Sequence, residues 1–398
     1  MVEVTRREVL KGMSATVAGT LLGSRGGRAQ GELRILGRPV EVAISSVSAR
    51  TVRLSVIPLE ADRPMPIPQD GSLVRETWEA PALRLRALRS SQRVPLGDLV
   101  VWFSPEPLTI HVETREGRLV QRLQLDPRTG AMSFLLGEGP VLGLGQGGPQ
   151  FDRRGSRDLM RSGQGGYRLR THGGRVPIPW LIGTSGWAMF VHQPEGIFDL
   201  TGSEGRFEPR RVEEALPLDV FVIGTPEPTE IMAEYARLTG LPEMPPLWAL
   251  GYQQSHRTLA GRDEVLSVAR TFREKKLPCD VLIYLGTGFT PSGWNTANGS
   301  FSFNRSVFPD PERMIRELHE MHFRIVLHVV ILSRALRGTA RDGCELARFD
   351  EEEAGCYWNL HRRVYAMGVD GWWVDEGDPL DRASRLVRNR LYWEGPQI

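Results

Sequence analysis

The stretch Gly-Trp-Trp-Val-Asp-Glu-Gly-Asp-Pro at residues 371–379 indicates the fold of the second half of the chain most directly. A short apolar run ends abruptly in the carboxylates Asp375, Glu376 and Asp378. Short apolar runs are typical of buried strands, and acids that follow such a strand are typical of the carboxyl edge of a parallel sheet, where polar sites form. Asp378 also precedes Pro379, so its alternative role is to cap the next helix.

Strands and helices alternate four times in the second half of the chain. The expected strands are residues 248–253, 280–285, 324–331 and 371–374, and the expected helices are residues 262–276, 310–322, a segment within 345–367, and 380–392. Four alternations in order predict parallel β/α units. They fill residues 245–398, fewer than the ~250 residues of a closed (β/α)8 barrel. The sequence therefore predicts the first half of a TIM barrel, and a complete, doubly wound open sheet is the alternative.

The first half of the chain has a different texture. From residue 32 to about residue 225, short alternating apolar runs are separated by Gly, Pro and Asp, which is typical of an antiparallel β-sandwich. A short helix is expected at residues 231–239, and the prolines at 242, 245 and 246 mark a boundary. We therefore expect an all-β sandwich domain over residues 30–240 and an incomplete α/β barrel domain over residues 241–398.

The N-terminal segment predicts an export signal. Arg6 and Arg7 precede a weakly apolar run at residues 12–23, and Gly27-Arg28-Ala29 offers a small-x-small cleavage site. The run is too short to span a bilayer, and paired arginines before it resemble a twin-arginine signal. We expect residues 1–29 to be a twin-arginine signal peptide, the protein to be periplasmic or extracellular, and no membrane anchor to remain after cleavage. The alternative is an N-terminal amphipathic helix that belongs to the fold.

The composition excludes one broad class of function. Lys and Arg number 50 against 48 Asp and Glu, and the arginines are scattered, so nothing predicts a nucleic-acid partner. Hydrophobic residues make up 40%, which is enough for the cores of an ordinary globular protein. We expect no cofactor and no metal, and the oligomeric state is not predicted. A hard cation held by Asp375, Glu376, Asp378 and Asp381 is a minor alternative, because no loop of known metal spacing accompanies them.

The three cysteines, Cys279, Cys344 and Cys356, are too few for a disulfide framework and match no zinc-ligand spacing. Cys279 lies at a predicted buried strand and is expected in the core. A bond between Cys344 and Cys356 is conceivable outside the cytoplasm. Twin-arginine cargo, however, folds before export in a reducing compartment, so we expect no structural disulfide.

Several segments in collinear order resemble glycoside hydrolase family 31. Upstream, GLGQGGPQFDRRG at residues 143–155 resembles the loop that the family's β-sandwich sends toward the active site. The barrel segments that carry the resemblance are TGLP at 239–242, PPLWALGY at 245–252, FREKKLPCD at 272–280, FPDP at 308–311, ELHEMHFRIVLH at 317–328 and DGWWVDEGDP at 370–379. Together they cover most of the mature chain. The resemblance implies a galactose-mutarotase-like sandwich followed by a TIM barrel.

The resemblance also implies a retaining α-glycosidase, similar to α-glucosidases and α-xylosidases. The family's nucleophile is the Asp of a Trp-x-Asp-x-x-Glu pattern, which corresponds to Asp375, with Trp373 before it and Asp378 in place of the Glu. Asp375 is expected to form a covalent glycosyl ester, while a second carboxyl group about 5–5.5 Å away protonates the leaving oxygen and then activates water. The family's acid/base lies on a later strand, beyond residue 398, so we expect a truncated enzyme that is inactive as it stands.

Eight residues are candidates for contact with the sugar. They are Asp378, Trp373, His328, Trp294, Asn295, Gln253, His256 and Arg257. Trp294 is expected to stack on a sugar face and Asn295 to bond its hydroxyls, although a loop tryptophan is more often a packing anchor. His328 has the alternative of a satisfied core histidine, and Arg257 that of an ion-pair residue. Relatives that bind glucose usually carry an Asp at the end of strand two, whereas residues 285–289 here contain no carboxylate.

Two other classes of function remain open. The first is a non-catalytic sugar-binding module, in which the sandwich docks glycans and the half-barrel is vestigial. The second is a transglycosylase or an α-glucan lyase of the same family, which uses the same intermediate differently. The expected partner is a carbohydrate in all three cases.

Overall fold

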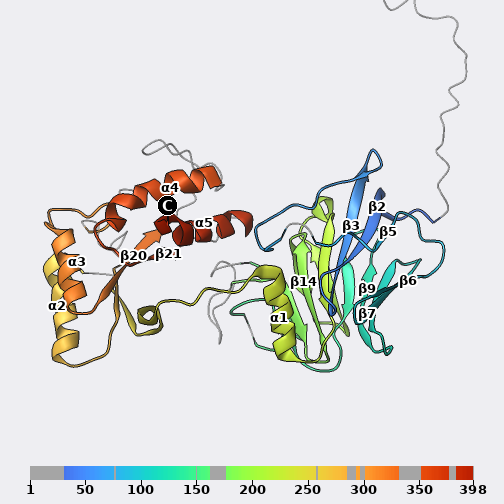
Figure 1. Ribbon diagram of the computed structural model, residues 1–398, viewed down its shortest axis with the longest axis horizontal. Coiled ribbons are helices and arrows are strands. Elements are labelled where there is room, and N and C mark those ends of the chain that lie inside the picture. Colours follow the sequence, from blue (N-terminus) through green and yellow to red (C-terminus); the bar gives the residue numbers. More distant parts are fainter. Residues whose placement is uncertain are drawn as a thin grey trace, which may run out of the picture.

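The computed structural model describes residues 31–75, 78–148, 150–161, 176–256, 259–284, 293–295, 301–330, 351–375 and 382–397. Two groups of elements lie at opposite ends of its longest axis, antiparallel sheets at one end and parallel β/α units at the other (Figure 1). The residues that follow helix α1 (Pro228–Thr239) connect them. Among the helices of these described ranges, none is long and apolar enough to cross a membrane.

The first group contains two antiparallel sheets. The nine-stranded sheet consists of β1 (Arg34–Ile35), β2 (Arg38–Ser46), β3 (Thr51–Glu60), β4 (Arg63–Pro64), β5 (Leu83–Leu85), β11 (Val141–Gly143), β13 (Trp180–Gly183), β14 (Trp187–Gln193) and β17 (Leu218–Ile223). The eight-stranded sheet consists of β6 (Gln92–Leu96), β7 (Leu99–Ser104), β8 (Thr109–Thr114), β9 (Leu119–Leu125), β10 (Met132–Leu135), β12 (Arg157–Asp158), β15 (Gly196–Asp199) and β16 (Glu204–Pro209).

The two sheets share one apolar core. Alternate residues of β2, such as Val42 and Ile44, meet residues such as Phe103 of β7 and Val112 of β8 in a single buried cluster. Period-two patterning points every second side chain to the same face, so each sheet supplies one apolar layer. The predicted antiparallel β-sandwich is therefore present.

Helix α1 covers the other face of the nine-stranded sheet. Ile231 and Leu238 of α1 lie in a second buried cluster with Phe190 and Phe221 of the sheet. The apolar residues that the helix buries are spaced about two turns apart, which places them on one side of it. This packing fixes the end of the sandwich from which the chain leaves for the parallel units.

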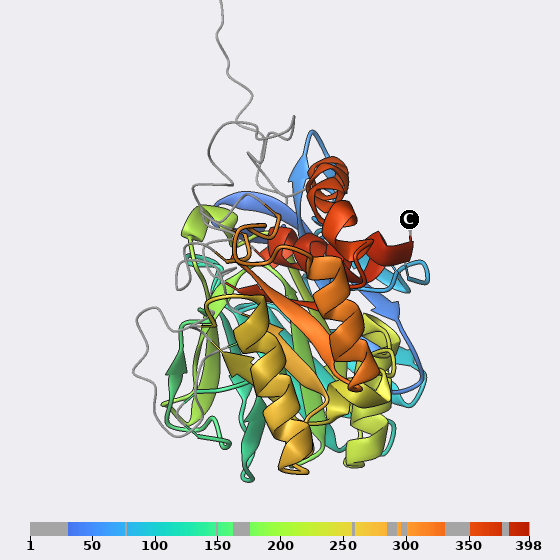
Figure 2. The ribbon, with the colours of Figure 1, turned by 90° about the vertical axis from the view of Figure 1, so that its left-hand side faces the viewer.

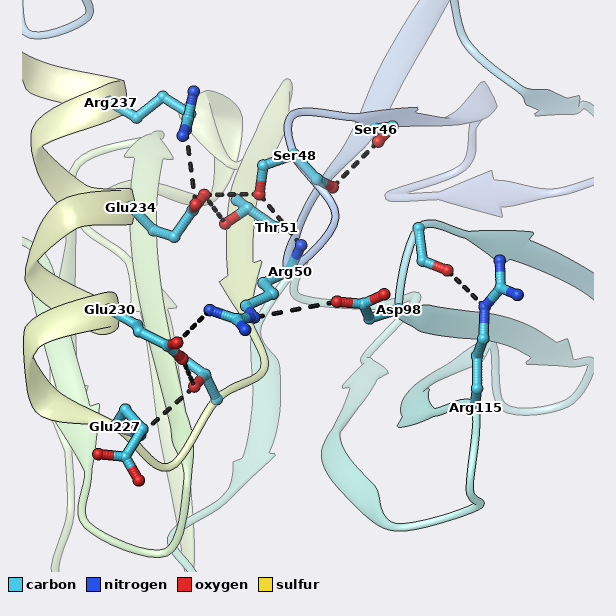
Figure 3. Close-up of polar contacts among 12 residues, drawn as sticks. Ser46, Ser48, Arg50, Thr51, Asp98, Arg115, Glu227, Glu230, Glu234 and Arg237 are labelled. Atoms are coloured by element: carbon cyan, nitrogen blue, oxygen red, sulfur yellow. Dashed lines mark hydrogen bonds and ion pairs between the residues drawn. The ribbon is translucent and has the colours of Figure 1, made fainter.

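A polar cluster fastens α1 to the turn between β2 and β3 (Figure 3). Glu234 of α1 accepts hydrogen bonds from the hydroxyls of Ser48 and Thr51, both at 2.6 Å. One turn earlier, Glu230 forms an ion pair with Arg50. Thr51 is fully buried, so its hydroxyl depends on the Glu234 carboxylate for a partner.

Replacing Glu234 with Ala is expected to destabilise the sandwich by about 1–3 kcal/mol, because the buried Thr51 hydroxyl loses its acceptor. Glu227, which is exposed at the start of α1 and makes no side-chain capping bond, is the matched control. Glu227→Ala should change stability by less than about 0.5 kcal/mol. Urea unfolding followed by hydrogen exchange in β3 measures both. Equal effects would contradict the role given to Glu234.

A buried ionic network lies on the face of the nine-stranded sheet that α1 covers. Asp219 of β17 accepts two hydrogen bonds from Arg53, at 2.8 and 2.9 Å, and one from Ser55 at 2.7 Å. His192 of β14 lies 2.8 Å from Asp219 and 3.4 Å from Asp70. Burial alone would raise the pKa of Asp219 and lower the pKa of His192. The hydrogen bonds and charges of the network outweigh burial, so the pKa of Asp219 is lowered and that of His192 is raised.

These shifts predict how the stability of the sandwich depends on pH. The raised pKa of His192 contributes stability that is fully present below about pH 6.5, its unfolded value, and is lost as pH rises through the folded value. The lowered pKa of Asp219 contributes stability above about pH 4 that is lost on acidification. His192→Gln should remove the alkaline decline, as measured by urea unfolding from pH 5 to 9. An unchanged alkaline slope would contradict the assignment.

The second group contains one parallel sheet. Its strands, β18 (Gln253–His256), β19 (Val281–Tyr284), β20 (Arg324–Val330) and β21 (Gly371–Asp375), pair in chain order. Its helices are α2 (Arg262–Glu274), α3 (Pro311–Glu320), α4 (Glu351–Tyr365) and α5 (Arg382–Glu394). A doubly wound sheet reverses its strand order at a switch point, and these four strands do not. Figure 2 shows α2 and α3 side by side over one face of the sheet.

Local sequence explains where these helices begin and end. The carboxylate of Asp310 accepts a hydrogen bond from the Arg313 amide at 2.9 Å, and Pro311 occupies the first helical position of α3. Met314, Ile315 and Leu318 are then buried against the sheet. The predicted helices and the last three predicted strands are all present, with bounds shifted by a few residues at most.

Two predictions about strands and disulfides are wrong. The strand expected at residues 248–253 begins at Gln253 instead, because residues 247–250 form a short 3-10 turn with Leu247 and Leu250 exposed. Short apolar runs do not distinguish a strand from other structures. The disulfide prediction also fails: Cys356 in α4 is disulfide-bonded, whereas Cys279 is free and buried as expected. The prediction of no disulfide was based on the reducing compartment in which such a protein folds. The compartment sets the redox conditions, but the fold decides whether two sulfur atoms lie close enough to bond.

Three short 3-10 helices complete the described elements. They are η1 (Val212–Glu214), η2 (Leu247–Leu250) and η4 (Gly395–Gln397). The predicted signal peptide at residues 1–29 lies outside the described residues. It therefore stays a prediction.

Candidate active site

Strand β21 carries its carboxylate at the carboxyl edge of the parallel sheet. Asp375 is the last residue of the strand and pairs with Val330 of β20. Because side chains alternate along a strand, Trp373 and Asp375 project to one face, and Trp372 and Val374 to the other. About half of the Asp375 side chain is exposed (48%), so the carboxylate is accessible to a ligand.

The side chain of His328 contacts the Asp375 carboxylate directly. His328 lies on β20, two residues before the partner of Asp375 and on the same face of the sheet. Its Nε2 is 3.0 Å from Oδ2 of Asp375, and its ring meets that of Trp373 edge to face at 5.1 Å. His328 is 1% exposed, whereas Trp373 is 39% exposed. The structure thus brings together three of the residues that the sequence singled out.

A second contact holds the main chain at the same point. Arg388 of α5 donates a hydrogen bond from Nη2 to the carbonyl oxygen of Asp375. Arg388 is buried, and the sequence analysis missed it. Its spacing could have indicated a buried position. Arg388 lies three residues before Leu391 and four before Tyr392, and residues at these spacings share one side of a helix, here the side of α5 that packs into the core.

Behind β21 lies a layer of aromatic side chains. Trp372 packs against His361 of α4 and Tyr392 of α5, and His361 approaches the Tyr392 hydroxyl at 3.1 Å. Burial lowers the pKa of His361 to about 4, so its imidazole is neutral near pH 7. This layer supports the strand from the side opposite to the carboxylate.

Trp294 and Asn295 do not face a ligand. Trp294 is fully buried, and its indole Nε1 donates to the carbonyl oxygen of His328 at 2.8 Å. Asn295 is also fully buried, and its Oδ1 accepts from the Phe301 amide at 2.9 Å. The expectation that Trp294 stacks on a sugar and Asn295 binds hydroxyls is therefore wrong in this structure. Trp294 is a packing anchor that fixes β20 at His328.

Trp294→Phe should destabilise the parallel unit by about 1–3 kcal/mol, because the His328 carbonyl loses its donor in a buried position. The control is Trp393→Phe, since Trp393 is 53% exposed and its loss should cost less than about 0.5 kcal/mol. Hydrogen exchange of the amides in β20 under increasing urea measures both. If the two variants were equally stable, the hydrogen bond would not be structural.

Of the remaining sugar-contact candidates, only His256 lies at the edge of the sheet that carries Asp375, among the residues that the structure describes. Gln253 begins β18 and donates to the Ala249 carbonyl at 2.8 Å, so it lies at the amino end of the strand, opposite to the edge expected for it. His256 ends β18, at the same edge of the sheet as Asp375. Arg257 and Asp378 lie outside the described residues, as does the stretch 285–289.

Within the segment 143–155, an arginine orders the glycine-rich turn at residues 143–147. Buried Arg153 donates to the carbonyl oxygens of Gly143, Gly145 and Gly147, at 2.9, 3.1 and 2.8 Å. One guanidinium thereby gathers three carbonyls of the glycine-rich turn. The expected approach of this loop to the active site stays a prediction.

Within the described residues, no group of three His, Cys, Asp or Glu side chains is arranged to hold a metal ion. Glu376, Asp378 and Asp381 lie outside those residues, so the minor alternative of a cation beside Asp375 is not tested.

Comparison with known proteins identifies relatives of both halves. Residues 242–392 match the family model described as "Glycosyl hydrolases family 31 TIM-barrel domain". An alpha-xylosidase of Saccharolobus solfataricus is 26% identical over 71% of this chain and 42% of its own length. Alpha-glucosidase 2 of Bacillus thermoamyloliquefaciens is 37% identical over 41% of this chain and 23% of its own length.

A solved structure shares the fold over most of the chain. The family 31 dextranase of Flavobacterium johnsoniae, complexed with isomaltotriose, superposes with a TM-score of 0.70 over 86% of this chain and 46% of that one, at 18% identity. This chain thus spans less than half the length of each of these three proteins.

Proposed function

We propose that this chain is the N-terminal part of a retaining α-glycosidase of family 31 with Asp375 as its nucleophile, because residues 242–392 match the model of that family's TIM-barrel domain. The observation that carries the proposal is the position of Asp375. It ends the fourth parallel strand at the carboxyl edge, half exposed and fixed through its side chain and its main chain. A carboxylate held in one geometry yet open to a ligand suits nucleophilic attack.

The proposal includes the architecture of the catalytic domain. Four parallel strands in chain order correspond to the first half of a (β/α)8 barrel, and the preceding sandwich corresponds to a galactose-mutarotase-like domain. The strand order supports this assignment because a barrel is wound in a single direction.

The chemistry follows from two carboxyl groups. The Asp375 carboxylate attacks the anomeric carbon while the bond to the leaving oxygen breaks, and that oxygen takes a proton from the acid/base. Water then attacks the same carbon, gives its proton to the acid/base, and the electron pair of the ester bond returns to Asp375. We propose that the acid/base lies on a later strand than these four. Without it the leaving group departs unassisted, at a cost of ~10²–10⁴ in rate.

We propose α-linked oligosaccharides or glycosides as substrates. The relatives named as an alpha-xylosidase and an alpha-glucosidase, and a dextranase complexed with isomaltotriose, support this class. We further propose export through the predicted signal at residues 1–29, which would bring the enzyme to extracellular glycans.

Loss of Asp375 should abolish hydrolysis. With the later barrel strands in place, Asp375→Ala should lower the rate on 4-nitrophenyl α-glycosides by roughly 10⁴-fold or more, as for other hydrolases that lose their nucleophile. The matched control is Asp370, which directly precedes β21 and is hydrogen-bonded to His319 and Arg324. Asp370→Asn should keep the kcat of the folded enzyme.

Two outcomes contradict the proposal. Equal rates for Asp375→Ala and wild type would exclude Asp375 as the nucleophile. Reading the gene past the codon for residue 398 tests the architecture, because the proposal needs further β/α units with a carboxylate on one of the later strands. A sugar-binding module would instead bind glycans with an affinity that Asp375→Ala leaves unchanged.

A further inference from the structure

We propose that His328 is the positioning residue of this site, donating its Nε2 proton to Oδ2 of Asp375 so that the carboxylate is oriented for attack and stabilised as it leaves. This inference rests on the proposed role of Asp375 as nucleophile. The distance of 3.0 Å between the two atoms is that of a direct hydrogen bond. Their strands are adjacent and parallel, so the contact joins two rigid elements.

The environment of His328 determines which nitrogen carries the proton. Its Nδ1 is buried and has no hydrogen-bond partner in the described part of the chain. A proton on Nδ1 would be a buried donor without an acceptor, which is costly. An ionised carboxylate only accepts hydrogen bonds, so the partner of Asp375 must donate. Both requirements favour the tautomer with its proton on Nε2.

Two other histidine–aspartate pairs show how this one differs. In His192–Asp219 the aspartate is fully buried, and in His319–Asp370 the aspartate side chain is 11% exposed and the histidine 31%. In His328–Asp375 the order is reversed, with 2% for the histidine and 48% for the aspartate. The first two arrangements satisfy a buried carboxylate. In the His328–Asp375 pair, by contrast, a buried histidine contacts a carboxylate that is half exposed.

The contact is expected to act most strongly when the glycosyl ester breaks. In the free enzyme Oδ2 belongs to a charged carboxylate, whereas in the ester it belongs to a neutral acyl group. Hydrogen bonds to charged acceptors are about twice as strong as those to neutral ones. Donation from His328 therefore favours the state in which the electron pair has returned to Asp375, and its loss should slow deglycosylation.

Three substitutions separate donation from shape. The amide nitrogen of Gln occupies the position of Nε2, so His328→Gln keeps a donor toward Asp375. That of Asn corresponds to Nδ1 and does not reach, and Met has no donor. In the enzyme with the later barrel strands in place, His328→Met and His328→Asn should lower kcat on an activated 4-nitrophenyl α-glycoside by ~10–100-fold and lower KM with it. His328→Gln should stay within about threefold of wild type.

Accumulation of the intermediate is the specific signature. Mass spectrometry of the intact protein at steady state should show more enzyme carrying a sugar on Asp375 in His328→Met than in wild type. His319→Gln, in the pair at the opposite end of the sheet, is the control and should leave kcat and KM unchanged. Because Nδ1 has no hydrogen-bond partner among the described residues, His328→Met should also be at least as stable as wild type. If it does not fold, the comparison of Gln with Asn decides.

The outcomes distinguish this inference from the function on which it rests. No covalent sugar on Asp375 and no hydrolysis by the wild-type enzyme would overturn both. An active wild type with equal kcat in all three variants, a raised KM at unchanged kcat, or a Gln variant as slow as Asn would overturn the role of His328 alone. Nitrogen-15 NMR of the histidines in the 398-residue chain adds a test that needs no activity: a His328 tautomer with its proton on Nδ1 would also overturn it.

Discussion

The parallel register between β20 and β21 is the constraint on which the site depends. It pairs Val330 with Asp375 and His328 with Trp373, so His328 and Asp375 share one face of the sheet. A slip of one residue would turn Asp375 toward the helices and bring Trp372 to the open face. Side-chain hydrogen bonds do not set this register. The apolar residues of both strands set it, because this alignment places Leu327, Val329 and Trp372 on the face that packs into the apolar cluster shared with the helices.

The two faces of β21 differ in burial and in side-chain type: one face packs against the helices, and the other is partly exposed. On the helix side, Trp372, Trp358 and His361 form an aromatic layer in which burial keeps the imidazole neutral. That layer has little freedom to move, because interiors are close-packed. On the open side, a carboxylate and an indole remain partly exposed. Arg388 links the sides, since it is anchored in α5 and bonds the main chain of Asp375.

Sequence patterns predicted the elements well but not their tertiary contacts. The helices expected at residues 262–276 and 310–322 agree with α2 and α3 to within a few residues, because the signals that place helices are local in the sequence. The burial of Trp294 depends on a carbonyl 34 residues away, and the pairing of His328 with Asp375 spans 47 residues on separate strands. No local pattern encodes such distances. Asp375 is a candidate from the sequence alone, because its position at the end of a short apolar run is a local feature.

A buried polar atom without a hydrogen-bond partner destabilises the fold, so its presence at His328 calls for a reason. His328 lies between apolar residues on β20, and a leucine or methionine would fill its place without leaving Nδ1 unpartnered. The sandwich network shows the contrasting case, in which His192 and Arg53 satisfy the carboxylate of Asp219 completely inside the protein. A buried histidine that satisfies an outward-facing acid stabilises the fold little. Its cost is intelligible if the orientation and charge of Asp375 matter to a ligand, since strained or unsatisfied groups persist where function requires them.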